Sequence, residues 1–373
     1  MLELYTTPDL IALTLVLAHL AIPLVYYWWC RSRWLYKNQY VKLDDNYLPK
    51  VSIIVPTYEE ADVIEQKLDN LYQQNYPKDK LEVVIVDSAS RDSTPEKVRN
   101  WARRHPDFPL KLVEEPIRMG MAHALQTGFL NSSGDIVVVT DADSLWPNRN
   151  TLHKVVKWLS CKKIGAVSCI KLPLSKSDVE QTYREYYNVL RIAESKAWST
   201  PIFHGELSAF KRKLLEKIGS FPQGVGSAEA LAAMKVCALG YRVVTPETVV
   251  VYELVPRKDY YKWRIRRAQH LILHLRESLK LLRHYNSTFK KIILMEFYLH
   301  VINPWLLLAS IGWLITSVLS VSILAVAILG LGGFALAIFR PAKTWLVNQL
   351  LLIAAQLRFL KTKELVWKKS RKI

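Results

Sequence analysis

Two carboxylates follow an apolar, β-branched run in the stretch Asp135-Ile136-Val137-Val138-Val139-Thr140-Asp141-Ala142-Asp143. The run is too short and too rich in valine for a helix, so it predicts a strand buried on both faces. In open α/β sheets, ligands bind at the carboxyl ends of the strands. Asp141 and Asp143 would lie at that end, where a carboxylate pair suits a hard divalent cation that also contacts a phosphate. On this segment alone, an ordinary Asp-rich turn is an equally good interpretation.

Strands and helices alternate on the N-terminal side of this stretch. The pattern predicts strands at 51–56, 81–86 and 110–114. It also predicts one helix that begins at Thr57 and two further helices at 94–104 and 120–129. Such alternation predicts a mostly parallel sheet covered by helices on both faces. Asp87, at the end of the second strand, would then lie on the same edge of the sheet as Asp141 and Asp143.

The chain combines a high apolar content with a strongly basic charge. Half of its 373 residues are hydrophobic, yet the formal net charge is +18. A purely soluble enzyme rarely has both properties, whereas a membrane protein with a basic cytoplasmic face does. A nucleic-acid-binding protein is the other interpretation of such a charge.

An apolar run from Leu10 to Trp29 is about 20 residues long, enough to cross a bilayer. A cleaved signal peptide would have basic residues before the run and small residues after it. Here Glu3 precedes the run, and Arg31 and Arg33 follow it. We therefore expect residues 1–30 to form a membrane anchor whose C-terminal end is cytoplasmic.

Three further segments extend the membrane pattern towards the C-terminus. Residues 257–291 carry eleven basic residues among aromatic and aliphatic ones, which predicts helices lying in the membrane interface, although a solvated basic face would look similar. The nearly uncharged stretch 292–340 predicts two membrane helices, roughly 297–316 and 319–339. Residues 341–373 predict an interfacial helix and a basic tail, because another span would put the terminal lysines outside the cell.

Several segments resemble motifs of glycosyltransferase family 2, whose members have a GT-A fold, and they occur in the family's order. They are Pro56-Thr57-Tyr58-Glu59-Glu60, Val86-Asp87-Ser88-Ala89-Ser90, Asp141-Ala142-Asp143, Phe203-His204-Gly205-Glu206 and Ser227-Ala228-Glu229. The resemblance covers about residues 49–270. It implies a cytoplasmic GT-A domain over residues 31–256 that binds a nucleoside diphosphate sugar.

The resemblance also implies roles for individual residues. These are donor binding by Pro56, Tyr58, Glu60, Asp87, Arg118 and Asp141, metal binding by Asp143 and Asp141, and acceptor contacts from His204, Gly205, Glu206, Trp263, Arg266 and Arg267. The metal would be Mg²⁺ or Mn²⁺, since both accept oxygen ligands. For Glu60 the alternative is an ordinary carboxylate at a helix N-terminus. A lone histidine beside a glycine, such as His204, is more often structural.

Glu229 aligns with the catalytic aspartate of the family's T-E-D motif when the motif is counted back from Gly240 and Tyr241. A carboxylate at this place can take the proton of an acceptor hydroxyl as that hydroxyl attacks the anomeric carbon. The resemblance therefore implies a single displacement with inversion. The alternative is a solvated glutamate in the first turn of a helix predicted at 228–239.

Together these features predict an α/β GT-A domain with a mostly parallel central sheet, interfacial amphipathic helices and about three transmembrane helices. We expect a membrane glycosyltransferase, resembling a small cellulose-synthase-like enzyme, that acts at the cytoplasmic leaflet. It would move a hexose to a lipid-linked acceptor, as in the assembly of lipid-linked oligosaccharides for N-glycans. By family analogy the donor is GDP-mannose.

Three other functions compete with this one. The chain could instead be a polyprenyl (dolichyl) phosphate sugar synthase. A processive polysaccharide synthase is less favoured, because Arg266 alone matches the family's Q-x-x-R-W motif and Arg267 replaces its tryptophan. The non-enzymatic alternative is a basic membrane protein that binds anionic lipid or nucleic acid. For the enzyme we expect membrane lipids as partners and no nucleic acid.

Overall fold

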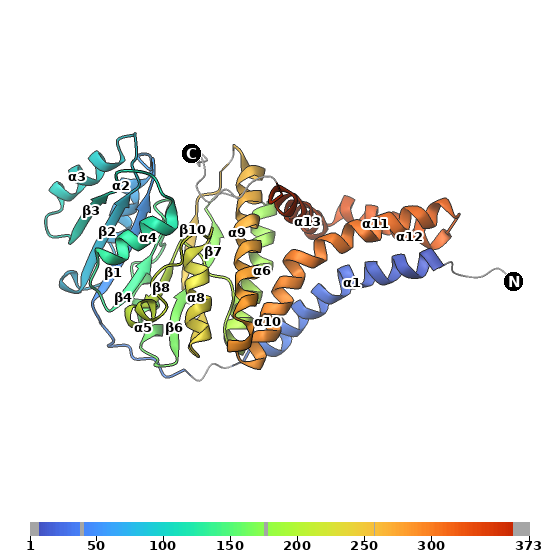
Figure 1. Ribbon diagram of the computed structural model, residues 1–373, viewed down its shortest axis with the longest axis horizontal. Coiled ribbons are helices and arrows are strands. Elements are labelled where there is room, and N and C mark those ends of the chain that lie inside the picture. Colours follow the sequence, from blue (N-terminus) through green and yellow to red (C-terminus); the bar gives the residue numbers. More distant parts are fainter. Residues whose placement is uncertain (1–6, 38–40, 175–177, 257, 361–373) are drawn as a thin grey trace.

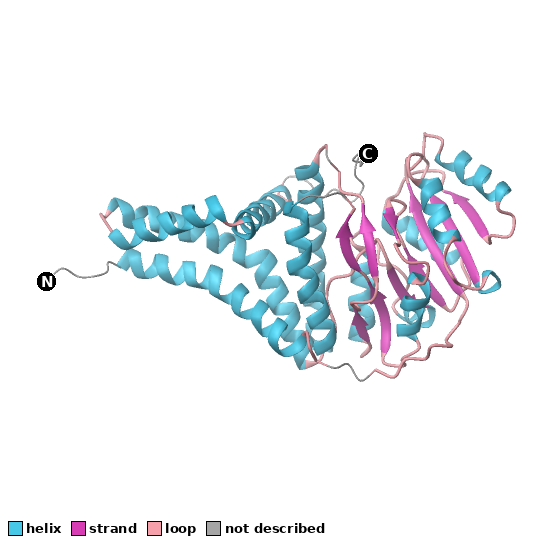
Figure 2. Ribbon diagram, turned by 180° about the vertical axis from the view of Figure 1, so that it is seen from behind, coloured by secondary structure: helices cyan, strands magenta, loops and turns pink. Residues whose placement is uncertain are grey.

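A rounded α/β domain carries a long arm of helices in the computed structural model, which describes residues 7–37, 41–174, 178–256 and 258–360. Helices α6, α9 and α10 stand between the sheets and the arm (Figure 1). Figure 2 shows the strands gathered on one side of these helices. Arg257 and the basic tail beyond residue 360, both part of the predicted membrane-associated region, lie outside the described residues.

The α/β domain alternates strands and helices in the following order. Its elements are β1 Val51–Thr57, α2 Ile64–Tyr72, η2 Lys78–Lys80, β2 Leu81–Asp87, α3 Thr94–Arg104, β3 Leu110–Glu114, α4 Met121–Leu130, β4 Ile136–Val139, β5 Ser144–Leu145, α5 Thr151–Leu159, β6 Ile164–Ser168, β7 Ile170–Pro173, α6 Asp178–Ala197, β8 Ser208–Lys211, α7 Arg212–Lys217, α8 Ala228–Ala238, β9 Arg242–Val244 and β10 Val250–Glu253.

The main sheet has seven strands in the order β3-β2-β1-β4-β8-β6-β9. It is mostly parallel, as predicted, and β8 runs antiparallel to both of its neighbours. All four residues of β4 are buried. Ile136 and Val138 belong to one hydrophobic core, and Val137 and Val139 to the core on the opposite face. The predicted strand buried on both faces is therefore confirmed.

A second, three-stranded sheet has the order β5-β10-β7. The sequence pattern predicted no strand after Thr140. These later strands are two to five residues long and each contains a polar or charged residue, so they lack the continuous apolar run that marks β4. This small sheet matters for the site, because β7 and β10 carry the buried charged residues described below.

The helix after β1 begins at Ile64 and not at Thr57 as predicted. Two side chains hold the backbone between β1 and α2. Ser90 Oγ, in the β2–α3 loop, accepts from Glu59 N at 2.8 Å, and Thr94 Oγ1, at the start of α3, accepts from Glu60 N at 2.8 Å. Glu59 also has a left-handed φ of 54°. Glu60 therefore lies at the end of the loop that leads into the helix, where its carbonyl oxygen accepts from Ile64 N at 2.9 Å.

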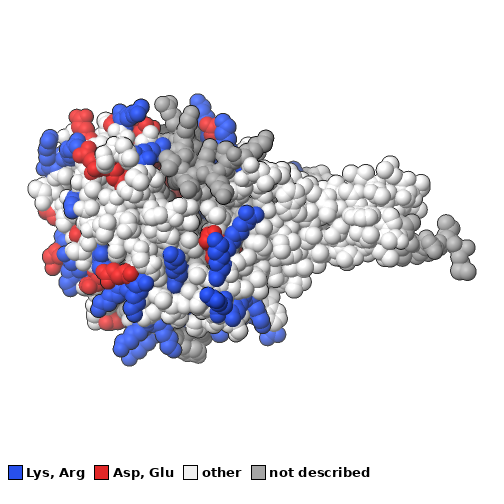
Figure 3. Space-filling model, viewed as in Figure 1, with Lys and Arg blue, Asp and Glu red and all other residues white. Residues whose placement is uncertain are grey.

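The arm and the helices beside it complete the fold. They are α1 Thr7–Trp29, the π-helical turn η1 Cys30–Trp34, α9 Tyr260–Lys280, η3 Leu282–His284, α10 Ser287–Phe297, the π-helical turn η4 Tyr298–Ile302, α11 Asn303–Leu319, α12 Ile323–Ile338 and α13 Arg340–Arg358. On the face shown in Figure 3, the arm is uncharged while lysine, arginine and acidic residues cover the α/β domain.

Two helical runs are long and apolar enough to cross a membrane, Thr7–Trp34 and Ser287–Leu319. The second helical run begins at residue 287, ten residues before the predicted membrane helix at 297–316. The domain boundary expected at residue 291 therefore falls inside α10. Helices α12 and α13 qualify only as a pair, and they meet at a bend of 106°. The described residues thus contain two such helices, or three if the bent pair counts as one span.

Helix α9 was predicted to lie in the membrane interface as part of residues 257–291. It packs against α8, α10 and α13 and buries Trp263, Ile272 and Leu275. Arg264 and Arg267 on this helix turn towards buried carboxylates, which accounts for part of the basic run without any lipid headgroup.

A buried ion pair joins the α/β domain to the second membrane-length run. Arg191 of α6 donates to Glu296 Oε1 of α10 at 2.8 Å and lies 3.4 Å from Glu194 Oε2. We expect Arg191→Met to lower stability by about 3–5 kcal/mol, because it leaves a buried carboxylate without its cation. Thermal unfolding in detergent measures the effect. Arg99→Met, which removes a half-exposed pair with Glu114, should cost less than about 1 kcal/mol. Equal losses in the two variants would contradict the prediction.

Candidate active site

A cavity of about 340 Å³ opens at the carboxyl ends of β1 and β4 and extends to α6, α9 and α13. Strand register explains why the predicted residues meet there. Ile54 pairs with Val139 and Thr57 with Asp87, so β1, β2 and β4 end at one edge of the sheet. The predicted residues that line the cavity are Pro56, Tyr58, Glu60, Arg118, Asp141, Asp143, His204, Gly205, Glu206, Glu229, Trp263, Arg266 and Arg267.

Asp87 is the predicted donor-binding residue that the structure leaves out of the cavity wall. Its carboxylate is buried and accepts hydrogen bonds from Thr57 Oγ1 at 3.0 Å, Ser90 N at 2.9 Å and Ser90 Oγ at 2.7 Å. It therefore holds the β1 and β2 loops together, and the neighbouring Ser88 lines the cavity instead.

Asp141 and Asp143 present two carboxylates to the cavity directly after β4. Asp141 N donates to Gly205 O at 3.1 Å, and a Cβ at Gly205 would lie only 3.1 Å and 3.2 Å from the two carboxylate oxygens of Asp141. A glycine at this place thus keeps the carboxylate open to the cavity.

A divalent cation with oxygen ligands fits the carboxylate pair. No group of three or more histidine, cysteine, aspartate or glutamate side chains that could hold a metal occurs in the described part of the chain. The pair would therefore hold a cation together with phosphate and water oxygens, which is how Mg²⁺ is commonly bound in proteins.

Tyr58 and Arg118 form a flat platform on the β1 side of the cavity. The guanidinium carbon of Arg118 lies 3.5 Å from the centroid of the Tyr58 ring. Such stacking holds a planar cation in place beside the cavity. Both residues were predicted to bind the donor, and the structure brings them together.

Glu229 lies in the first turn of α8 and is 6 % exposed. Ser227 Oγ donates to its Oε1 at 3.0 Å, while Oε2 is buried and makes no hydrogen bond. Burial raises the pKa of Glu229, and the Ser227 hydrogen bond acts against this rise. The alternative of a solvated first-turn glutamate is wrong, because the side chain is buried and lines the cavity.

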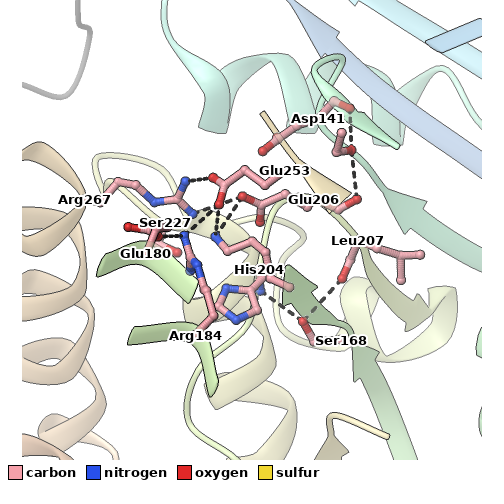
Figure 4. A network of polar contacts seen from close by, with 12 residues as sticks. Asp141, Ser168, Glu180, Arg184, His204, Glu206, Leu207, Ser227, Glu253 and Arg267 are labelled. Atoms are coloured by element: carbon pink, nitrogen blue, oxygen red, sulfur yellow. Dashed lines mark hydrogen bonds and ion pairs between the residues drawn. The ribbon is translucent and has the colours of Figure 1, made fainter. Parts of the chain in front are cut away.

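A buried network of charges forms the cavity wall on the side of the small sheet, α6 and α9 (Figure 4). Lys171 Nζ of β7 lies 2.8 Å from Glu206 Oε1 and 3.3 Å from Glu253 Oε2 of β10. Arg267 binds both glutamates, and Arg184 binds Glu253 at 2.7 Å. The members are the cations Lys171, Arg184, Arg264 and Arg267 and the carboxylates Glu180, Glu206 and Glu253. Four cations against three carboxylates leave this wall with a net positive charge.

Glu206 lines the cavity, but its carboxylate pairs with cations inside the protein. Its side chain is 2 % exposed, and its carboxylate serves Lys171 and Arg267. Burial raises the pKa of Glu206, but the two cations outweigh this and hold it well below the ordinary value. His204 lines the cavity as a neutral imidazole, because burial and the cationic wall lower its pKa.

Several cavity residues had not been identified from the sequence. They are Lys171 on β7, and Tyr183, Arg184, Tyr187, Asn188 and Arg191 on α6. Their partner Glu253 was missed as well. A usable signal was the single charge inside an apolar strand, as in Ile170-Lys171-Leu172 and Val250-Val251-Tyr252-Glu253. Buried charges of this kind are rare unless they are paired.

Comparison with known proteins agrees with this geometry. The model of glycosyl transferase family 2 matches residues 52–219, and that of glycosyl transferase family group 2 matches residues 136–357. The chain is similar to the mannosyltransferase PcManGT of Pyrobaculum calidifontis, solved in complex with GDP-Man and Mn²⁺. The two are 51% identical with a TM-score of 0.88, over 96% of this chain and 100% of that one.

Two curated relatives are more distant. The probable glycosyltransferase YdaM of Bacillus subtilis is 28% identical over 59% of this chain, and a poly-β-1,6-N-acetyl-D-glucosamine synthase of Staphylococcus epidermidis is 23% identical over 66%. The chain spans 54% and 60% of the length of these relatives. The family models, the α/β fold and the carboxylate pair in the cavity lead to one conclusion: the chain is a member of glycosyltransferase family 2 with a GT-A-like fold.

Proposed function

We propose that the protein transfers mannose from GDP-mannose, with Mn²⁺ or Mg²⁺, to a lipid-linked acceptor at the cytoplasmic face of a membrane. The observation that carries the proposal is the cavity itself, which joins the carboxylate pair after β4 to a buried glutamate and then to helix α13. The choice of donor and metal is supported by the 51% identity to a mannosyltransferase solved with GDP-Man and Mn²⁺.

The donor would lie on the β1 and β4 side of the cavity. Asp141 and Asp143 would hold the metal, and the stacked Arg118 would face the diphosphate. The metal supplies a positive charge that stabilises the diphosphate as it leaves. Tyr58 and Glu60 line the same side and are placed to contact the nucleoside.

Glu229 would act as the general base. Its Oε2 is the free acceptor at this side of the cavity, and its raised pKa suits proton transfer near neutral pH. The proton of the acceptor hydroxyl would pass to Oε2 while the oxygen attacks the anomeric carbon and the nucleoside diphosphate departs. A single displacement of this kind inverts the configuration of the sugar.

The acceptor would enter from the side of the helical arm. Asn348, Leu351 and Leu352 of α13 line the cavity together with His300 of η4, and both elements adjoin membrane-length helices. The net positive charge of the wall around Lys171 and Arg267 suits an acceptor that carries phosphate. The two membrane-length helices and the uncharged face of the arm seen in Figure 3 support a membrane location.

The same positive wall also suits direct transfer to a polyprenyl phosphate, which is the second candidate. The products distinguish the two candidates. Sugar transfer to a lipid-linked saccharide forms a new glycosidic bond, whereas a polyprenyl phosphate sugar synthase forms a phosphodiester that mild acid cleaves. Mild acid also releases the glycan of a lipid saccharide linked through phosphate, so chromatography of the released label decides between them: free mannose indicates the polyprenyl phosphate sugar, and a longer saccharide indicates transfer to a lipid-linked saccharide.

The metal site is tested with Asp143→Ala. We expect this variant to lose Mn²⁺-dependent GDP binding by at least about tenfold, because one of two protein ligands is gone. Calorimetric titration of GDP with and without Mn²⁺ measures the loss. Asp107→Asn, at an exposed aspartate that accepts from Tyr72, is the control and should bind like the wild type. Wild-type binding by Asp143→Ala would refute the assigned metal site.

The base is tested with Glu229→Gln. This variant keeps the size of the side chain and should bind donor within about twofold of the wild type, yet lose about 10²–10⁴ in kcat, the range for removal of a general base. Steady-state kinetics with GDP-[¹⁴C]mannose and extracted lipid acceptor measure kcat. Turnover at the wild-type rate would show that Glu229 has another role.

The pH profile provides a further test. Because burial raises the pKa of Glu229 and the base acts when ionised, kcat/KM should fall on the acid side above the ordinary glutamate value of 4.5. Ser227→Ala removes the hydrogen bond that lowers this pKa, so the acid limb should move to still higher pH. A limb that stays in place or moves to lower pH in Ser227→Ala would contradict the assignment.

A further inference from the structure

A lysine that does not reach the cavity holds the turn that carries the carboxylate pair. Lys67 of α2 is completely buried and is absent from the described residues that line the cavity. Its ammonium nitrogen lies 2.7 Å from Thr140 Oγ1, 2.9 Å from Ser144 O and 3.1 Å from Ser144 Oγ. It also lies 5.1 Å from the centroid of the Trp146 ring.

The two partners of Lys67 stand on either side of the metal-binding pair. Thr140 immediately precedes Asp141, and Ser144 immediately follows Asp143. Ser144 Oγ also donates to Asp141 O at 2.9 Å, which closes the turn on itself. One ammonium group therefore joins both ends of the five-residue turn Thr140–Ser144 from within the protein.

The direction of these hydrogen bonds follows from the chemistry of lysine. An ammonium group has three donors and no acceptor, so both hydroxyls must accept from it and donate onwards. Thr140 Oγ1 donates to Glu206 O at 2.8 Å, while Ser144 Oγ has Asp141 O and Glu206 O within reach. Lys67 thus sets the orientation of both hydroxyls and connects the turn to segment 204–206.

The positive charge of Lys67 indicates a role beyond filling space in the core. Burying an ammonium group costs several kcal/mol, and an apolar side chain of the same length would avoid that cost. Its contacts above are all with neutral oxygens. Burial lowers the pKa of Lys67 to about 7, and the carboxylates of Asp141 and Asp143 oppose this change. A nearby cation reduces the mutual repulsion of two carboxylates that must face the same ion.

We propose that Lys67 is a positioning residue for the metal and nucleotide: through Thr140 and Ser144 it holds the turn so that Asp141 and Asp143 face one cation together. The proposal rests on the metal site proposed above. Lys67 touches neither donor nor acceptor in this arrangement, and its effect on binding passes entirely through the turn.

The main test is Lys67→Met in the full-length protein in detergent. GDP binding is titrated by calorimetry with Mn²⁺ and with EDTA, and bound Mn²⁺ is followed by electron paramagnetic resonance. We expect Mn²⁺-dependent GDP binding to weaken at least about tenfold, as for lost charge-assisted hydrogen bonds, while binding in EDTA stays within about twofold. Lys78→Met, which removes a partly buried lysine stacked on Tyr72, should leave both titrations unchanged.

A matched pair at Thr140 keeps the test decisive if Lys67→Met does not fold. Thr140→Val keeps the shape of the side chain and removes the hydroxyl, so it should weaken Mn²⁺-dependent binding, whereas Thr140→Ser should stay near the wild type. In the double variant Lys67→Met/Thr140→Val, the losses should be smaller than the product of the single effects, because the two residues act in one contact.

Three results would overturn the proposal. They are Mn²⁺-dependent binding within twofold of the wild type in Lys67→Met, an equal loss in EDTA, and indistinguishable binding by Thr140→Val and Thr140→Ser. Failure of the proposed function looks different, because the wild type itself would then show no Mn²⁺-dependent nucleotide binding.

Discussion

The residue Glu206 connects the two halves of the cavity through its backbone and its side chain at once. Its carbonyl oxygen accepts hydrogen bonds from Thr140 Oγ1, at the start of the turn that carries the carboxylate pair, and from Trp146 Nε1, just beyond that turn. Its carboxylate binds Lys171 and Arg267, which belong to the small sheet and to α9. Glu206 therefore links helix α9 to the turn after β4.

Buried ion pairs are the second constraint on the fold, and they act at two places. The network around Lys171 binds the small sheet to α6 and α9, and the Arg191–Glu296 pair binds α6 to α10. Pairs of this kind add little net stability over apolar packing, but breaking one is costly, so they favour one arrangement over its alternatives. They hold the helical arm in a defined position against the α/β domain (Figures 1 and 4).

Sequence reasoning succeeded where local pattern and structure coincide. The strand of β4, the helix α3 and the strand β3 were predicted to within a residue, because their residues repeat with a clear period and end at turn-forming residues. It failed for β5 to β10, which lack the continuous apolar run of β4. It also gave no sign that the Glu206 carboxylate pairs with Lys171 and Arg267, since a motif places a residue near a site without saying which way its side chain turns.

The sequence by itself determined the family, the carboxylate pair after a doubly buried strand, the glutamate at the start of α8 and the apolar runs of the arm. Each of these depends on residues that are neighbours along the chain. The tertiary structure alone decided that Asp87 supports a loop, that α9 turns its arginines inwards, and that Lys67 holds the turn from 140 to 144. These features depend on contacts between residues that are dozens of positions apart, such as Lys67 with Thr140 and Arg264 with Glu180. Such contacts form only when the sheet order and the packing of the helices bring the segments together, which no local period in a sequence encodes.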